Sequence, residues 1–184
     1  MLIRTHSERG FTIIEMLIGI AIVALLFKLA VPTFRIWLQN TQIRSAAHAI
    51  TDGMNVARGE AIRRNVPVQL QLTTAGGGTG AAWTVSELPP PSGTGAVVQN
   101  WSAAEGASSA QIVQAGGGIL TFNALGRVFA KNPINNSAAL LQVDVTSSNA
   151  ASDPALRPMR VVVGNGGQAR MCDPQLAQPD PRAC

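Results

Sequence analysis

Residues 9–31, RGFTIIEMLIGIAIVALLFKLAV, form the most apolar segment of the chain. The apolar run that follows Gly10 contains only two ionisable side chains, Glu15 and Lys28. As a helix rising about 1.5 Å per residue, this run spans roughly 31 Å, the thickness of the hydrocarbon core of a bilayer. The sequence therefore predicts a membrane-spanning helix over residues 11–34.

The charges that flank the run favour one orientation. Arg4 and Arg9 precede it and favour a cytoplasmic N-terminus, whereas Arg35 and Arg44 follow it and weaken that preference. Lys28 lies near the far end, where its long side chain can reach towards the headgroups. A cleaved secretory signal fits poorly, because its apolar region should be about 7–15 residues long and end at a small-residue cleavage site.

Glu15 is the unusual residue of the run. A carboxylate inside an apolar segment costs a few kcal/mol in lipid and usually needs a partner. Two interpretations remain open from the residues alone. Glu15 is either a tolerated charge near the membrane edge, or a charge that another group neutralises once the helix leaves the lipid.

The segment from Arg9 to Glu15 resembles the prepilin leader motif of type IV pilins and type II secretion pseudopilins. The resemblance implies that residues 1–10 form a leader, that a prepilin peptidase cleaves after Gly10, and that Phe11 becomes N-methylated. It implies that Glu15 pairs during assembly with the α-amino group of its own or a neighbouring subunit. It also places Pro32 where many such proteins carry a helix-kinking proline.

Beyond Pro32 the apolar residues recur at helical spacing. Such a stripe is typical of an amphipathic helix packed on a globular head, so we expect one long helix from Phe11 to about Arg64. Asn65 and Pro67 end the pattern. The stripe consists of Ile43, Ala47, Ile50, Met54, Ala57 and Ala61.

Residues 66–184 are rich in short strand patterns separated by Gly, Pro and Asn. The predicted fold class is therefore α+β: a long N-terminal helix, half membrane-spanning and half amphipathic, packed on a periplasmic head (35–184) of antiparallel β-sheet. Loops are expected at 75–80, 88–95 and 103–110. The predicted strands are Val66–Thr73, Trp83–Val85, Val97–Trp101, Ile112–Val113, Ile119–Phe122, Leu140–Thr146 and Met159–Val163.

The head is similar to GspH/FimT-type minor pseudopilins in three places: Ala57–Asn65, Phe122–Arg127 and Arg170–Cys172. This resemblance implies a type IV pilin-like fold and a minor pilin that assembles into, and helps to prime or cap, a type IV pilus. A minor pseudopilin of type II secretion is the alternative. The implied partners are the prepilin peptidase, other major and minor pilins, and the inner membrane, which the chain would cross once.

A DNA-binding alternative comes from the C-terminal part of the chain. One member of the family is associated with DNA uptake and carries a C-terminal Gly-Arg-x-Arg motif. Here Gln168 replaces the first arginine of the motif, so that only Arg170 matches. Arg157 and Arg160 could join Arg170 in a small basic face, or the three could be scattered, solvated charges. A net charge of +4 permits an anionic partner without requiring one.

Cys172 and Cys184 are the only cysteines. An even pair in an exported head suggests a disulfide, which would close the tail of residues 173–183. A redox-active role is the alternative, but the C-x-x-C spacing is absent.

The sequence favours no enzyme class and no cofactor or metal. It lacks the nucleophile-elbow, P-loop and H-E-x-x-H motifs, and its two histidines, His6 and His48, are far apart. Hydrophobic residues make up 46%, charged residues 13% and aromatic residues 4% of the chain, with no Tyr. This composition argues against a disordered chain, a coiled coil and a base-stacking module.

Overall fold

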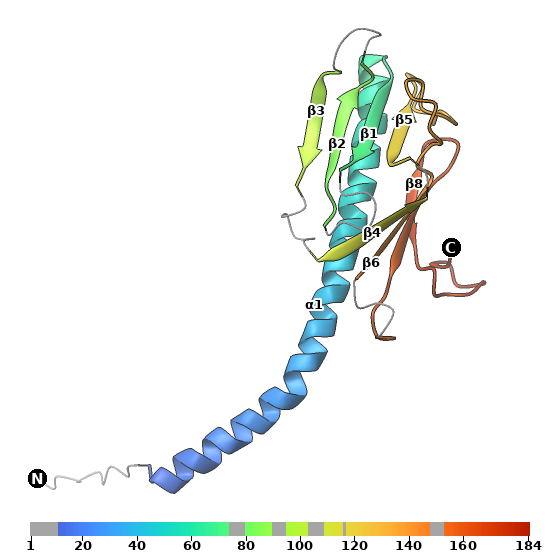
Figure 1. Ribbon diagram of the computed structural model, residues 1–184. Helices are drawn as coiled ribbons and strands as arrows, with labels where there is room; N and C mark the ends of the chain where they lie inside the picture. The colour runs from blue at the N-terminus through green and yellow to red at the C-terminus, as the bar shows by residue number, and fades with distance from the viewer. Residues whose placement is uncertain (1–10, 74–79, 90–94, 103–108, 116, 148–152) are drawn as a thin grey trace, which may run out of the picture. The chain divides into compact units, whose positions relative to one another are not determined.

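A computed structural model of the chain describes residues 11–73, 80–89, 95–102, 109–115, 117–147 and 153–184 (Figure 1). Within these residues, one α-helix is followed by eight β-strands. The chain divides into two compact units, Met1–Trp37 and Leu38–Cys184, which we describe separately. The α+β class predicted from the sequence is confirmed.

Helix α1 runs from Ile13 to Arg64 and continues through Pro32. It starts two residues later than predicted, because Thr12 caps it, and it ends where the sequence indicated. Acidic Glu15 lies in its first turn and basic residues occupy its last turn, which complements the helix dipole at both ends. The kink expected at Pro32 stays a prediction.

The first unit carries the apolar half of α1. Every side chain from Phe11 to Arg35 is exposed in the isolated chain, including the large aliphatic and aromatic ones. Among the described residues, α1 is the one helix whose length and composition allow it to cross a membrane. At the end of this unit Phe34 and Trp37 stack with ring centroids 5.7 Å apart.

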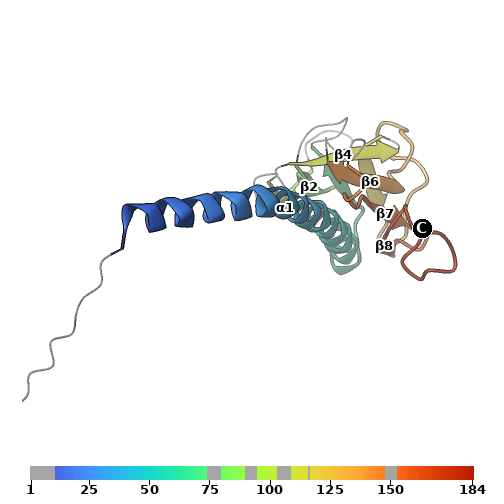
Figure 2. The ribbon, with the colours of Figure 1, turned by 90° about the horizontal axis from the view of Figure 1, so that it is seen from below.

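Two four-stranded antiparallel sheets form the rest of the second unit (Figures 1 and 2). The first sheet has the order β3-β2-β1-β5 and the second has the order β4-β6-β7-β8. The strands are β1 (Val68–Leu72), β2 (Trp83–Glu87), β3 (Val97–Trp101), β4 (Ala110–Ala115), β5 (Ile119–Phe122), β6 (Gln142–Ser147), β7 (Met159–Val163) and β8 (Ala169–Cys172).

All seven predicted strands are present, and β8 is the one that the sequence analysis missed. The predicted strand at 140–146 begins later, at Gln142, because the Leu140 N–H bonds to Ile119 O of the other sheet. Similarly, β4 and β5 are close in sequence but belong to different sheets. The expected loop 75–80 and most of the loops 88–95 and 103–110 lie outside the described residues, and Ala110 belongs to β4.

The core forms between the second half of α1 and the two sheets. All six residues of the predicted apolar stripe are buried, and Ala46, Ala49 and Gly53 widen it. Trp83 of β2 packs on this face, and its indole N–H donates a 2.8 Å hydrogen bond to the carbonyl of Ala49. Small helix residues are therefore needed where the sheet approaches α1 most closely.

Candidate assembly site

The N-terminal end of α1 is shaped by Thr12. The backbone N–H of Glu15 donates to Thr12 Oγ1 at 3.3 Å, and that of Met16 donates to Thr12 O at 3.2 Å. This is an N-cap, and the Thr-x-x-Glu spacing that announces it is readable in the sequence, although the sequence analysis did not use it. The cap starts the helix directly after Phe11 and puts Glu15 in its first turn.

Glu15 lies on one face of the helix together with Phe11 and Gly19, where the side chains leave an apolar groove of about 460 Å³. A Cβ added at Gly19 would meet nothing within 4 Å, so this position is open to a neighbouring helix. No ion pair to the Glu15 carboxylate occurs within the described residues. The groove is lined by Phe11, Glu15, Met16, Gly19, Ile20 and Val23.

The C-terminal tail is closed by a disulfide between Cys172 and Cys184, with the two Cα atoms 5.1 Å apart. Cys172 ends β8 and is buried, as is Ala183 beside its partner. Next to the disulfide, the Asp173 N–H bonds to Arg182 O at 2.7 Å. The tail is thereby attached to the sheet at both of its ends.

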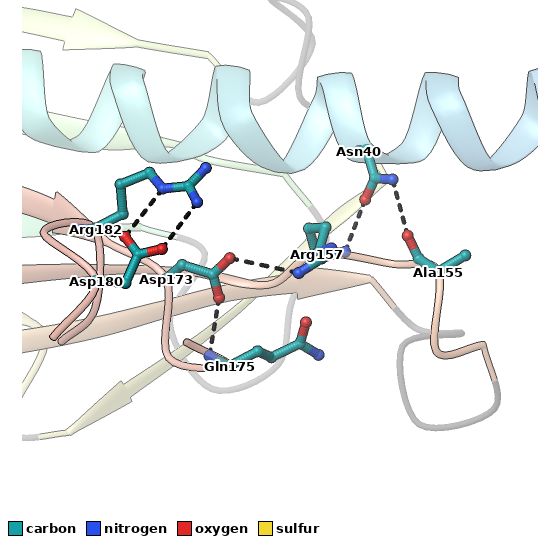
Figure 3. Close-up of polar contacts among 7 residues, drawn as sticks. All are labelled: Asn40, Ala155, Arg157, Asp173, Gln175, Asp180 and Arg182. Carbon is teal, nitrogen blue, oxygen red and sulfur yellow. Dashed lines mark hydrogen bonds and ion pairs between the residues drawn. The ribbon is translucent and has the colours of Figure 1, made fainter. Parts of the chain in front are cut away.

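The side chain of Asn40 on α1 forms two hydrogen bonds with the backbone of the segment that precedes β7 (Figure 3). Its Nδ2 donates to Ala155 O at 3.1 Å, and its Oδ1 accepts from the Arg157 N–H at 2.8 Å. Leu156, between the two bonded residues, is buried in the core. The Arg157 guanidinium faces the Asp173 carboxylate at 4.0 Å, so this segment also contacts the tail. The sequence analysis found neither contact, because the partners are far apart along the chain.

The structure gives the three arginines of the DNA hypothesis different surroundings. Arg160 forms a two-point ion pair with Asp144 on β6, at 2.5 and 3.1 Å, and this hydrogen bonding raises its pKa above the ordinary value. Arg157 faces Asp173, which leaves Arg170 as the exposed arginine for which the described residues offer no ion pair. The three do not form an uncompensated basic face, and the DNA-binding alternative is not supported.

Gly167, the glycine of the compared motif, has a packing role. Its φ is +80°, and an added Cβ would lie 2.1 Å from the carbonyl oxygen of Gly126. A glycine is required there by backbone conformation and by close approach, irrespective of any ligand.

The described residues contain no group of three or more His, Cys, Asp and Glu side chains that could hold a metal ion. His48 is exposed on α1. The candidate site of function is the N-terminal end of α1, where Thr12 caps the helix and Glu15 lines the apolar groove.

An apolar N-terminal helix of this kind, continued into an α+β head, defines a type IV pilin-like protein of the minor pilin and pseudopilin class. The model of the family "Type II transport protein GspH" matches residues 46–167, and that of the "Prokaryotic N-terminal methylation motif" matches residues 5–27. The chain thus belongs to the GspH family. The family is one of structural pilin-like proteins. No curated protein matches the chain.

Two solved structures share the fold. The type IV minor pilin FimU of Pseudomonas aeruginosa is 12% identical, with a TM-score of 0.50 over 72% of this chain and 97% of FimU. The minor pseudopilin EpsH from the Type 2 Secretion System of Vibrio cholerae is 14% identical, with a TM-score of 0.51 over 73% of this chain and 99% of EpsH.

Proposed function

We propose that this protein is a minor pilin that assembles into a type IV pilus and helps to prime or cap it. The observation that carries the proposal is the N-terminal methylation motif at residues 5–27, in which Glu15 lies in the first turn of a helix capped just after Phe11. In this proposal, a prepilin peptidase cleaves between Gly10 and Phe11 and methylates the new α-amino group. The chain itself acts by assembly, without catalysis or a cofactor.

Cleavage creates the charge that Glu15 needs. The new α-amino group belongs to Phe11, which lines the same groove as Glu15. In a dry filament core, a carboxylate and an ammonium group from neighbouring helices stabilise each other, whereas either one alone is costly. The pair would set the register of adjacent helices.

The proposed division of the chain follows from this. Residues 11–34 would lie in the inner membrane before assembly and in the filament core afterwards, with Lys28 near the outer edge of the bilayer. Residues 35–184 would form the periplasmic head, a boundary close to the division between the two compact units after Trp37. The long exposed apolar surface of the first unit supports this proposal. Exposing so much apolar surface to water is unfavourable, and such surfaces mark sites that contact lipid or other proteins.

We favour a pilus over a secretion pseudopilus because of the C-terminal disulfide between Cys172 and Cys184. A pilus tip leaves the cell, and a cross-linked tail resists unfolding there. A minor pseudopilin remains the alternative, and the genes that flank this one would distinguish the two.

The test is to shear filaments from cells that express the full chain and to analyse them by mass spectrometry. We expect head peptides together with an N-terminal peptide that begins at methylated Phe11. A strain without the prepilin peptidase is the control, and its chain should begin at Met1 and stay in the membrane fraction. Filaments that lack the chain, with normal filament numbers after its deletion, would refute the proposal.

A further inference from the structure

The turn after β5 presents a leucine on a fixed backbone. Asn123 Oδ1 accepts hydrogen bonds from the N–H groups of Leu125 (3.0 Å) and Arg127 (2.9 Å). Two backbone bonds, from Gly126 N–H to Asn123 O and from Asn123 N–H to Arg127 O, close the same turn. Gly126 has a φ of +72°, which favours glycine at this position.

Helix α1 and the turn between β7 and β8 both contact this turn. Arg58 of α1 donates from Nε to Gly126 O at 3.1 Å, and Ile62 lies so near Gly126 that an added Cβ would be 2.7 Å from its Cδ1. Gly167, in the turn between β7 and β8, lies against the Gly126 carbonyl. The backbone next to Leu125 is thus held by α1 and by the turn between β7 and β8, yet the Leu125 side chain is 76% exposed.

A groove of about 480 Å³ adjoins this leucine. Leu141, which also lines it, is 41% exposed. Among the described residues that line the groove, Arg127 carries the only charge. Exposed Lys131 directly follows the lining residue Ala130 in the sequence. The lining residues are Asn123, Leu125, Arg127, Val128, Ala130, Leu141 and Asn165.

These features describe a protein-binding surface and the chemistry of its partner. Because the backbone of this turn is already ordered, an exposed aliphatic side chain on it loses little conformational entropy when a partner binds. The positive charge of Arg127, with no acidic side chain among the described residues that line the groove, favours a carboxylate on the partner. Duplex DNA fits poorly, because its binding rests on many cations and gains nothing from exposed leucines.

We propose that the Leu125 groove, meaning the seven lining residues above, receives an acidic, aliphatic segment on the head of a neighbouring pilin. This inference rests on the proposed function, since it needs the chain to be in a filament. Leu125 would insert between apolar side chains of the partner, and Arg127 would pair with its carboxylate.

The test places the photo-crosslinker p-benzoylphenylalanine at position 125 of the full chain in filament-forming cells. We expect a cross-link to another pilin, mapped by mass spectrometry to a head segment that contains Asp or Glu. Adding Arg127→Glu should reduce the cross-link yield about tenfold, as expected when a close charge pair is reversed. Arg44→Glu, at an exposed position on α1, is the matched charge control and should leave the yield unchanged.

Other outcomes separate the two proposals. The crosslinker at Val97, which is 65% exposed on β3, controls for non-specific capture and should give no such product. Suppose that the chain is present in filaments. If position 125 then cross-links to nothing, to DNA or to lipid, the groove proposal is wrong and the proposed function stands. The same holds if Arg127→Glu does not change the cross-link yield. If the chain is absent from filaments, both fall. Resistance of each variant to limited proteolysis, compared with that of the wild type, shows that the variant is folded.

Discussion

Gly53 and Trp83 are in direct contact across the interface between α1 and the first sheet. A Cβ built on Gly53 would lie 2.7 Å from Cε2 of the indole ring. The same ring donates its N–H to Ala49 O, one turn earlier on α1. The missing side chain of Gly53 is therefore what lets the sheet lie close to the helix.

We predict that Gly53→Ala destabilises the head although alanine favours helix. Overlap with the buried ring outweighs the gain in helix propensity and should lower the free energy of unfolding by about 1–2 kcal/mol. Gly59→Ala is the matched control, because a Cβ there meets nothing within 4 Å. It should raise the free energy of unfolding by about 0.5–1 kcal/mol. Urea unfolding of the full chain in detergent, followed by Trp fluorescence, would measure both, and equal effects would refute the packing argument.

Glu15→Gln should separate membrane insertion from assembly. The variant removes the charge and keeps the side-chain size and the backbone N–H that bonds to Thr12. Insertion should be unchanged or more efficient, since a neutral side chain enters lipid more readily. Incorporation into filaments should fall strongly, as judged by immunoblots of sheared filaments against membranes. Glu87→Gln, in the head, is the control, and normal incorporation of Glu15→Gln would contradict charge pairing.

Opening the disulfide should loosen the tail and lower stability. Cys184→Ser leaves the buried Cys172 in place and removes a cross-link worth roughly 3 kcal/mol in the chain-entropy description. We expect a lower melting temperature and early proteolysis after residue 173. Reduction of the wild-type protein should shift its melting temperature to that of the variant. A free thiol on Cys172 in the native protein would show that the bond does not form.

The stability of the C-terminal end of α1 should depend on pH, because the folded state lowers the pKa of Glu60. Hydrogen bonds from Arg63 and Arg64, both at 2.6 Å to the same oxygen, lower the pKa of Glu60 from 4.5 to about 2. Because the pKa is lower in the folded state, the contribution of Glu60 is complete above about pH 4.5 and is lost as the pH falls towards 2.

The measurement compares the melting temperatures of the wild type and Glu60→Gln at pH 6 and pH 2.5. Their difference should shrink at the lower pH. It should also shrink at high salt, because the group is exposed and its ion pairs are screened. A difference that does not change with pH would disprove this role of Glu60.

Local patterns in the sequence were sufficient for much of this fold. The helix over Ile13–Arg64 and seven strands follow from hydrophobic periodicity, which each segment carries by itself. Strand β8 was missed because its four residues, Ala169–Cys172, include no β-branched or aromatic side chain. The division into two sheets was also not predictable, since Leu140 and Gln142 lie two residues apart and bond to different sheets.

The candidate site shows the same limit. The leader motif and Glu15 are contiguous and could be recognised, and the cap by Thr12 could have been. By contrast, the surroundings of Arg160 depend on Asp144, which reaches it only through the register of β6 and β7. Whether an arginine is a free cation or half of an ion pair is a property of the sheet.

The contacts of Asn40 span 115 and 117 residues of sequence. During synthesis the N-terminal part of the chain leaves the ribosome long before Ala155 and Arg157 do. In the proposed topology, the two hydrogen bonds of Asn40 therefore form only after residues up to Arg157 have been translocated. A chain that ended before Ala155 would keep the whole N-terminal apolar segment and the leader motif. It would lack both hydrogen-bond partners of the Asn40 side chain. Both contacts of Asn40 therefore require a chain that extends at least to Arg157.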